Sequence, residues 1–226
     1  MESSPKHAIT LEDILKDPQI HTYIDQGNRI LGVIGYTEHG FPHAKRSSNY
    51  ASYILKCLGY DDRTCELAAI AGYMHDIGNV VNRVAHAQSG ALMAFTLLTN
   101  MGMDPEEIAQ VVSAIGNHDE GTAAAVNPIA AALILSDKGD VRRTRVRDKE
   151  RVAIDIHDRV NYSVKESSTI IDSTHTNIEL KLKIDTSFCS VMDYFEIFLD
   201  RMILCRKAAE KLGLHFRLNI NGQTLL

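Results

Sequence analysis

The sequence predicts a mainly α protein, in which a helical bundle is followed by a small α+β C-terminal subdomain. Apolar residues recur with helical spacing through about Arg145, and glycines or Asx-Pro pairs mark where these segments end or begin. Beyond about Arg147, the segment 178–185 alternates apolar and polar residues at the period of a half-buried strand. We therefore expect a helical domain over residues 1–146 and an α+β subdomain over residues 147–226.

Length, cysteine usage and charge limit the class of protein. The 226 residues suffice for a core that needs no disulfides or structural metal, and the four cysteines form no C-x-x-C pair. A net charge of -5 argues against general nucleic-acid binding, for which a basic surface is expected. Residues 1–7 contain no apolar leader segment. A membrane-spanning helix needs about 18 consecutive apolar residues, and no stretch of the sequence approaches that length. We expect a cytoplasmic protein that does not enter the membrane.

Capping and stop residues place the helices of the first domain. Asp104-Pro105 and Asn127-Pro128 each combine an N-cap side chain with a proline in the first helical turn. Gly59, Gly78 and Gly102 are typical of helix C-termini. Helices are expected from Thr10, over 20–33, from His43 to Leu58, from Asp61 or Asp62 to Asp76, from His86 to near Gly102, from Asp104 towards His118, and from Asn127 towards Asp137.

The C-terminal part alternates strands and a helix. A short strand over 169–172 is expected as the hairpin partner of 178–185, and the segment 216–220 alternates in the same way. Between them, a broad apolar stripe from Val191 to Cys205 predicts one long helix. This unit could complete a pocket, mediate dimerisation or sense a ligand, and the sequence does not rank these roles.

Four histidines and two aspartates are candidate metal ligands, and each lies in or at the end of an expected helix. Imidazole nitrogen and carboxylate oxygen together suit divalent Fe, Mn, Co, Ni or Zn. Six ligands would over-supply one ion, whereas two ions that share a bridging carboxylate would use them all, and Asp76 is the natural bridge. The candidates are His43, His75, Asp76, His86, His118 and Asp137.

Basic residues near these positions are candidates for binding the phosphate of a substrate. Six of the residues from Lys138 to Lys149 are basic, and this run directly follows a proposed metal ligand. That placement suits an anionic substrate, although a solvated basic turn or helix is an equal alternative. The phosphate-binding candidates are Arg46, Lys138, Arg142 and Arg143.

The ordered ligand set resembles the HD superfamily of metal-dependent phosphohydrolases over roughly residues 40–145. Arg46 follows His43 at the third position, the pair stands in His75-Asp76-Ile77-Gly78, and His86 begins a His-x-x-x-Gly motif. The resemblance implies that a first metal is bound by His43, His75, Asp76 and Asp137, and that His86 and His118 complete a second site with Asp76 bridging.

The resemblance points to the dinuclear branch of this superfamily, usually with iron or manganese. Relatives in that branch include diadenosine-polyphosphate hydrolases and cyclic-dinucleotide phosphodiesterases. Asn79 stands where the cyclic-dinucleotide enzymes have lysine, and no Gly-Tyr-Pro motif follows His118. That subclass is therefore disfavoured.

These observations together predict an enzyme, a metal-dependent phosphohydrolase with His75 and Asp76 in catalytic positions. It would hydrolyse a phosphate ester or pyrophosphate, of a nucleotide in the first instance, through water activated by two divalent transition-metal ions. Whether it is a phosphomonoesterase, a phosphodiesterase or a pyrophosphatase is open, as is homodimer formation. The alternatives are a non-catalytic module that binds a metal or nucleotide for signalling, and a dinuclear-iron oxygenase.

Overall fold

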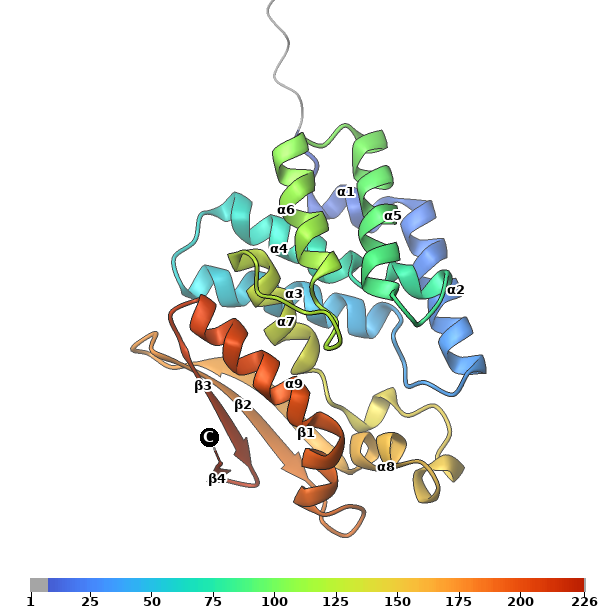
Figure 1. The fold of residues 1–226 in the computed structure, drawn as a ribbon, viewed down its shortest axis with the longest axis vertical. Coiled ribbons are helices and arrows are strands. Elements are labelled where there is room, and N and C mark those ends of the chain that lie inside the picture. The colour runs from blue at the N-terminus through green and yellow to red at the C-terminus, as the bar shows by residue number, and fades with distance from the viewer. Residues whose placement is uncertain (1–7, 226) are drawn as a thin grey trace, which may run out of the picture.

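The computed structural model describes residues 8–225 and shows a mainly helical fold with a small sheet at its C-terminal end (Figure 1). The predicted fold class is confirmed, whereas the division into two domains at residue 146 stays a prediction. Residues 1–7, on which the expected lack of a leader rested, lie outside the described part. Among the described helices, none is both long enough and apolar enough to cross a membrane.

The helices of the first part begin where the capping residues predict. Thr10 forms a capping box with Asp13, and the side chains of Asp61, Asp104 and Asn127 each accept a hydrogen bond from a backbone N–H in the first turn. The elements are α1 (Leu11–Lys16), α2 (Pro18–Val33), α3 (Phe41–Cys57), α4 (Asp62–Met74), the 3-10 helix η1 (Ile77–Val80), α5 (His86–Met101), α6 (Pro105–Gly116) and α7 (Pro128–Lys138).

Helices α4 and α7 form the centre of the bundle. Helix α4 packs against α3, α6 and α7, and every residue of α7 from Ile129 to Lys138 is buried. A helix that is apolar on all sides is stable only when its neighbours surround it. The C-terminal ends of α4 and α7 therefore carry their polar residues into the interior of the protein.

Two glycines allow the backbones around this centre to approach closely. A Cβ atom on Gly72 of α4 would lie 2.8 Å from backbone atoms of Ser47 on α3. A Cβ atom on Gly78 of η1 would lie 2.0 Å from the carbonyl oxygen of His86 and 2.4 Å from the backbone nitrogen of Gly90. These contacts set α3 against α4 and set the first turns of α5 against η1.

The C-terminal part contains a four-stranded sheet in the order β1-β2-β3-β4. Strands β1 and β2 form the predicted antiparallel hairpin, and α9 connects β2 to the parallel strand β3 while lying across one face of the sheet (Figure 1). Helix α9 also packs against α7. The elements are η2 (Arg143–Arg145), η3 (Glu150–Ala153), α8 (Ile156–Ser163), β1 (Val164–Ile171), β2 (Asn177–Ile184), α9 (Val191–Lys211), β3 (His215–Ile220) and β4 (Gln223–Thr224).

Two features of this part differ from the sequence-based expectation. Strand β1 begins at Val164, five residues before the expected 169–172, with a register shift between Val164 and Glu166. Helix α8 was not predicted, although the side chain of Asp155 caps it by accepting hydrogen bonds from the backbone of His157 and Asp158. A helix of 8 residues offers too little apolar periodicity to be recognised.

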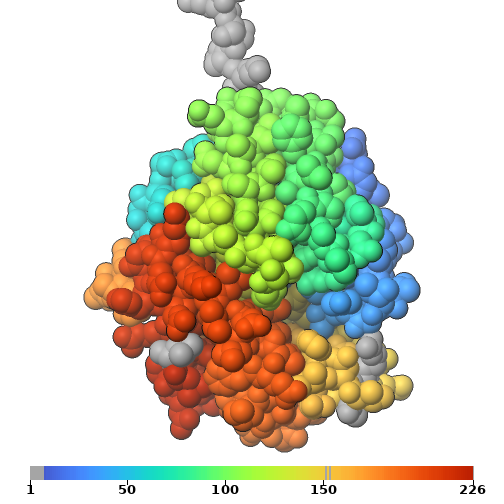
Figure 2. Space-filling view, viewed as in Figure 1, coloured from blue at the N-terminus to red at the C-terminus, as the bar shows by residue number. Residues whose placement is uncertain are grey.

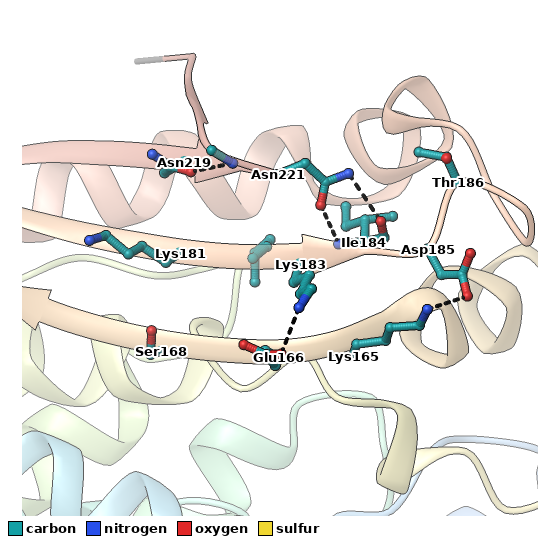
Figure 3. A pocket seen from close by; sticks show the side chains of 12 residues that line it. Lys165, Glu166, Ser168, Lys181, Lys183, Ile184, Asp185, Thr186, Asn219 and Asn221 are labelled. Carbon is teal, nitrogen blue, oxygen red and sulfur yellow. Dashed lines mark hydrogen bonds and ion pairs between the residues drawn. The ribbon is translucent and has the colours of Figure 1, made fainter.

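A groove of about 710 Å³ lies on the outer face of the sheet (Figure 3). Its lysines are paired with acids, since Lys165 lies 2.8 Å from Asp185 and Lys183 lies 3.1 Å from Glu166. Pairs of this kind are typical of a solvated sheet face and contribute little to stability. The groove contains none of the six candidate metal ligands.

Candidate metal centre

The six candidate ligands converge in the interior of the helical part. Three overlapping groups of them could each hold a metal ion, and the ligand atoms of each group lie within 4.8 Å of one another. The Nε2 atoms of His43 and His75 are 3.2 Å apart, and so are those of His86 and His118. The groups are His43, His75 and Asp76; His75, His118 and Asp137; and Asp76, His86 and His118.

Different elements bring these side chains together. His43 lies in the first turn of α3, and His75 and Asp76 follow the last residue of α4. His86 is the first residue of α5, and His118 follows the end of α6. Asp137 is the next-to-last residue of α7. The cluster thus forms where helix ends meet, as the positions of the ligands at helix termini predicted.

Each of the four histidines donates a hydrogen bond from its Nδ1 atom. The acceptors are the carbonyl oxygen of Gly72 for His75, at 2.8 Å, and Asp140 Oδ2 for His43, at 2.8 Å. His86 donates to the Arg83 carbonyl at 3.0 Å and His118 donates to the Ile115 carbonyl at 2.6 Å. Because a carbonyl oxygen only accepts, the proton of a neutral ring must be on Nδ1. The Nε2 lone pairs therefore face the cluster.

This arrangement places acceptors against acceptors. Two Nε2 lone pairs at 3.2 Å cannot hydrogen-bond to each other, and Asp137 Oδ1 lies 3.2 Å from Nε2 of His43. Among the described residues, Asp76 Oδ2 is a buried oxygen without a hydrogen-bond partner. Buried polar atoms without partners are costly, and cations that bind nitrogen and oxygen together would satisfy all of them. The residues therefore fit a site for divalent metal.

The two aspartates of the cluster are ionised at neutral pH. Burial alone would raise the pKa of Asp76, but the neighbouring His75 outweighs it and holds that pKa well below its usual range. Burial acts in the same way on Asp137, whose pKa is held well below its usual range by the adjacent Lys138 and by His43. Metal binding requires ionised carboxylates and imidazoles without a proton on the coordinating nitrogen, so an ion would compete with a proton at His75, whose pKa Asp76 raises against the effect of burial.

We expect the metal-free protein to lose stability on acidification. Burial lowers the pKa of His118 to about 3 and lowers those of His39 and His86, whereas the pKa of His75 is raised by Asp76 against the effect of its burial. Histidines in an unfolded chain have a pKa of about 6.5. Below that pH, the unfolded chain therefore binds more protons than the folded chain at three of these four residues, and folding becomes less favourable. Urea unfolding of chelator-treated protein at about pH 7.5 and at about pH 5.5 measures this loss of stability. A free energy of unfolding that is equal or larger at the lower pH would contradict the prediction.

Asp140, which the sequence analysis did not single out, positions His43. Its side chain is fully buried, and besides its bond to His43 it pairs with Arg46 at 3.0 Å and with Arg142. Arg46 also donates to the carbonyl oxygen of Ser167. Hydrogen-bond partners of this kind orient a ligand imidazole. The sequence signal was an acid three residues after Asp137, in Asp-Lys-Gly-Asp.

The other two phosphate-binding candidates are also engaged within the protein. Lys138 is buried and lies 2.7 Å from Asp137 Oδ2 and 3.1 Å from Glu120 Oε2. Arg143 packs over the ring of Tyr162 at 4.4 Å. The basic turn is therefore largely structural in its contacts, and the phosphate-binding role of Arg46, Lys138, Arg142 and Arg143 stays a prediction.

A pocket of about 390 Å³ has Arg83, Arg145 and Arg201 in its lining, with none of the four predicted phosphate-binding residues. It adjoins the cluster through Arg83, whose Nη1 atom lies 3.3 Å from Nε2 of His86. His39 also lines the pocket, and its ring stands edge-on to that of His43 at 5.5 Å. Sequence reasoning missed Arg83 and Arg201, because neither stands in a motif.

No family model matches the sequence, but a curated protein and a solved structure are similar to it. The chain is 27% identical over 158 residues to the uncharacterized protein MJ1020 of Methanocaldococcus jannaschii, covering 60% of this chain and 61% of that protein. It therefore spans less than two thirds of that relative. A solved structure from an uncultured Thermotogales bacterium is 25% identical with a TM-score of 0.44, over 59% of this chain and 75% of that one.

The second of these proteins is described as a predicted HD superfamily hydrolase. All six residues that the HD resemblance names as ligands appear in the three converging groups. The His-x-x-x-Gly motif has a structural explanation. Gly90 is the residue at which α5 approaches Gly78, and this close approach brings His86 towards Asp76.

Proposed function

We propose that this protein is a metal-dependent phosphohydrolase of the HD type that cleaves a phosphate ester or anhydride of a small molecule, with a nucleotide as the substrate class. One observation carries the proposal. Four imidazoles whose protons are held on Nδ1, together with two ionised carboxylates, converge on one interior space beside a pocket lined by arginines. Such a donor set suits divalent metals that act on phosphate substrates.

The ligands would divide between two ions. A first ion would be held by His43, His75, Asp76 and Asp137, and a second by Asp76 with His86 and His118, a division supported by the groups that share Asp76. Ions held by these residues would supply Lewis-acid polarisation of a phosphoryl oxygen and a lowered pKa of water.

The protein's own side chains would orient and stabilise the reacting groups. Asp140 and the backbone carbonyls fix the imidazole rings, and Asp76 would be the ligand shared by the two ions, a role supported by its short distances to the rings of both His75 and His86. Arg83 lies between Asp76 and the pocket, where a guanidinium would stabilise the negative charge that grows on a phosphoryl group. The partly enclosed position strengthens these charge interactions relative to water.

The proposal is tested by metal analysis of anaerobically purified protein combined with assays of phosphate release from nucleotides and from a generic phosphodiester. We expect about two transition-metal ions per chain and release of phosphate or of a nucleoside. Metal without turnover would favour the signalling module, and oxygen consumption by an iron-loaded sample would favour the oxygenase. A protein that binds no divalent metal under these conditions would overturn the proposal.

The cytoplasm is the compartment we propose for this enzyme. The four cysteines are unpaired, which fits a reducing environment. A small phosphate compound is the proposed partner, and neither a membrane partner nor general nucleic-acid binding is proposed.

A further inference from the structure

The pocket beside the His/Asp cluster is formed by both parts of the chain. It is lined by the loop that follows α2, by Arg83, by α8 and by α9. In Figure 2, surfaces from the α2 region, from α8 and from α9 meet on one face of the molecule. The pocket has a volume of about 390 Å³. Sites for small molecules typically measure about 300–1,000 Å³, so this pocket is near the lower end of that range. This size suits one mononucleotide rather than a dinucleotide or a polymer.

Arg83 connects this pocket to the cluster. Its Nη1 atom lies 3.3 Å from Nε2 of His86 and 4.0 Å from Oδ1 of Asp76, and Nη2 lies 4.0 Å from Asp119. These distances, like the 3.4 Å from Nη1 to Asn79 Oδ1, are longer than those of a good hydrogen bond, which are about 2.7–3.2 Å. The guanidinium also lies 5.4 Å from the centroid of the Tyr36 ring in the pocket wall, a contact that leaves its N–H groups available. Arg83 is therefore a donor that an incoming anion could engage.

Arg201 reaches the same pocket from α9. Its Nε atom donates to Glu120 at 2.7 Å, and its guanidinium lies over the ring of Phe198 at 4.2 Å. Glu120 also pairs with Lys138, which adjoins Asp137. Within residues 8–225 no hydrogen bond from either Nη atom of Arg201 is found. A guanidinium that is oriented on one edge and unpaired on the other is well suited to bind phosphate with two parallel hydrogen bonds.

The remaining lining suits an organic group with polar substituents. Ile34, Tyr36 and Ile197 provide an apolar and aromatic wall, and Asn161 and His157 of α8 provide hydrogen-bonding groups. The charged lining consists of three arginines against two aspartates, so it favours an anion. An apolar wall with a few polar groups is the usual composition of a site for a small ligand.

We propose that this pocket binds a mononucleotide-sized phosphomonoester, with its phosphate between Arg83 and Arg201 and its organic part against Tyr36 and Ile197. Helix α9 thereby supplies a substrate-binding residue, and the C-terminal part determines which ester is accepted. This assignment rests on the proposed hydrolase function for the fate of the ester, but binding itself is measurable without turnover.

Calorimetric titration of AMP, GMP, CMP, UMP and inorganic phosphate tests the pocket, with chelator-treated protein and again with manganese-loaded protein. The variants are Arg201→Met, Arg83→Met and, as the matched control, Arg206→Met on the exposed side of α9. We expect at least one monophosphate to bind more tightly than inorganic phosphate. Each pocket variant should weaken that binding about 10-fold or more, as expected for lost hydrogen bonds to a charged group, and Arg206→Met should not.

Two outcomes would overturn the pocket assignment: nucleotide binding no tighter than that of inorganic phosphate, or unchanged affinity in both pocket variants. Circular dichroism identifies a variant that fails to fold. If Arg201→Met fails to fold, Arg83→Met still tests the pocket. Arginine-dependent binding by a protein that takes up no metal and releases no phosphate would support the pocket and refute the hydrolase. Metal uptake and hydrolysis with unaffected affinity in both variants would refute the pocket alone.

Discussion

Replacing Asp76 with asparagine is expected to remove metal from both proposed ion positions and to abolish the proposed hydrolysis. Asp76 belongs to two of the three ligand groups, and its Oδ2 atom is buried without a hydrogen-bond partner. Asparagine has nearly the same shape, so the fold should persist while one negative charge is lost. Since substitution of partners that merely orient a ligand already costs about 10–100-fold in metal affinity, loss of the shared ligand should cost at least about 100-fold.

Elemental analysis and phosphate release measure this effect, with Asp25→Asn as the control. Asp25 pairs with Arg29 on the exposed side of α2, so its variant should keep both metal and turnover. His118→Ala gives an intermediate case, because that residue is assigned only to the second ion and its loss should reduce the content from about two ions to about one. Full metal content in Asp76→Asn would contradict the assignment of Asp76 as the bridge.

The second large effect is expected from Gly78→Ala. A Cβ atom at Gly78 would lie 2.0 Å from the carbonyl oxygen of His86 and 2.4 Å from the backbone nitrogen of Gly90. Neither backbone atom can turn aside as a side chain would, so η1 and α5 must separate. Adding a methylene to a packed core typically costs about 1–3 kcal/mol, and we expect a cost at or above the upper end of this range. His86 would be displaced from Asp76 at the same time.

Urea unfolding and metal content together measure the effect of Gly78→Ala. Gly116→Ala, at the end of α6, is the matched control, because its Cβ atom would meet only Ala91 Cβ at 3.5 Å. Alanine is favoured over glycine in a helix by about 1 kcal/mol, so this control should be neutral or slightly stabilising. A Gly78→Ala protein as stable as the control would show that η1 and α5 are not held as closely as described.

The helical part could be predicted from the sequence because its signals are local. Asp104-Pro105 and Asn127-Pro128 mark helix starts by side-chain capping, which needs no tertiary contact. The convergence of the six candidate ligands could also be predicted, because each of them lies in or at the end of an expected helix. Strand β2 was predicted to within one residue at each end, because its alternation reflects burial on one face of the sheet.

The missed features depend on contacts between distant segments. Asp140 gains its role from the buried pairing with His43, 97 residues earlier. Arg201 reaches Glu120 across 81 residues, through the packing of α9 against the helical part, which no local pattern encodes. The basic run after Asp137 fitted either an anionic ligand or a solvated turn, and neither reading anticipated that Lys138 is buried, where two acids compensate its charge.

The hydrogen bonds that fix the imidazole protons bear on which metal the protein carries. The rings are oriented by backbone carbonyls and by Asp140, so the protein's own hydrogen bonds determine which imidazole nitrogens are offered to a metal. A nitrogen and oxygen donor set ranks divalent metals largely by their intrinsic affinity order, in which zinc and copper exceed manganese and iron. Occupancy would therefore depend on this affinity order together with the concentrations of free metals, and a sample purified from zinc-rich medium need not hold the ion that supports the proposed hydrolysis.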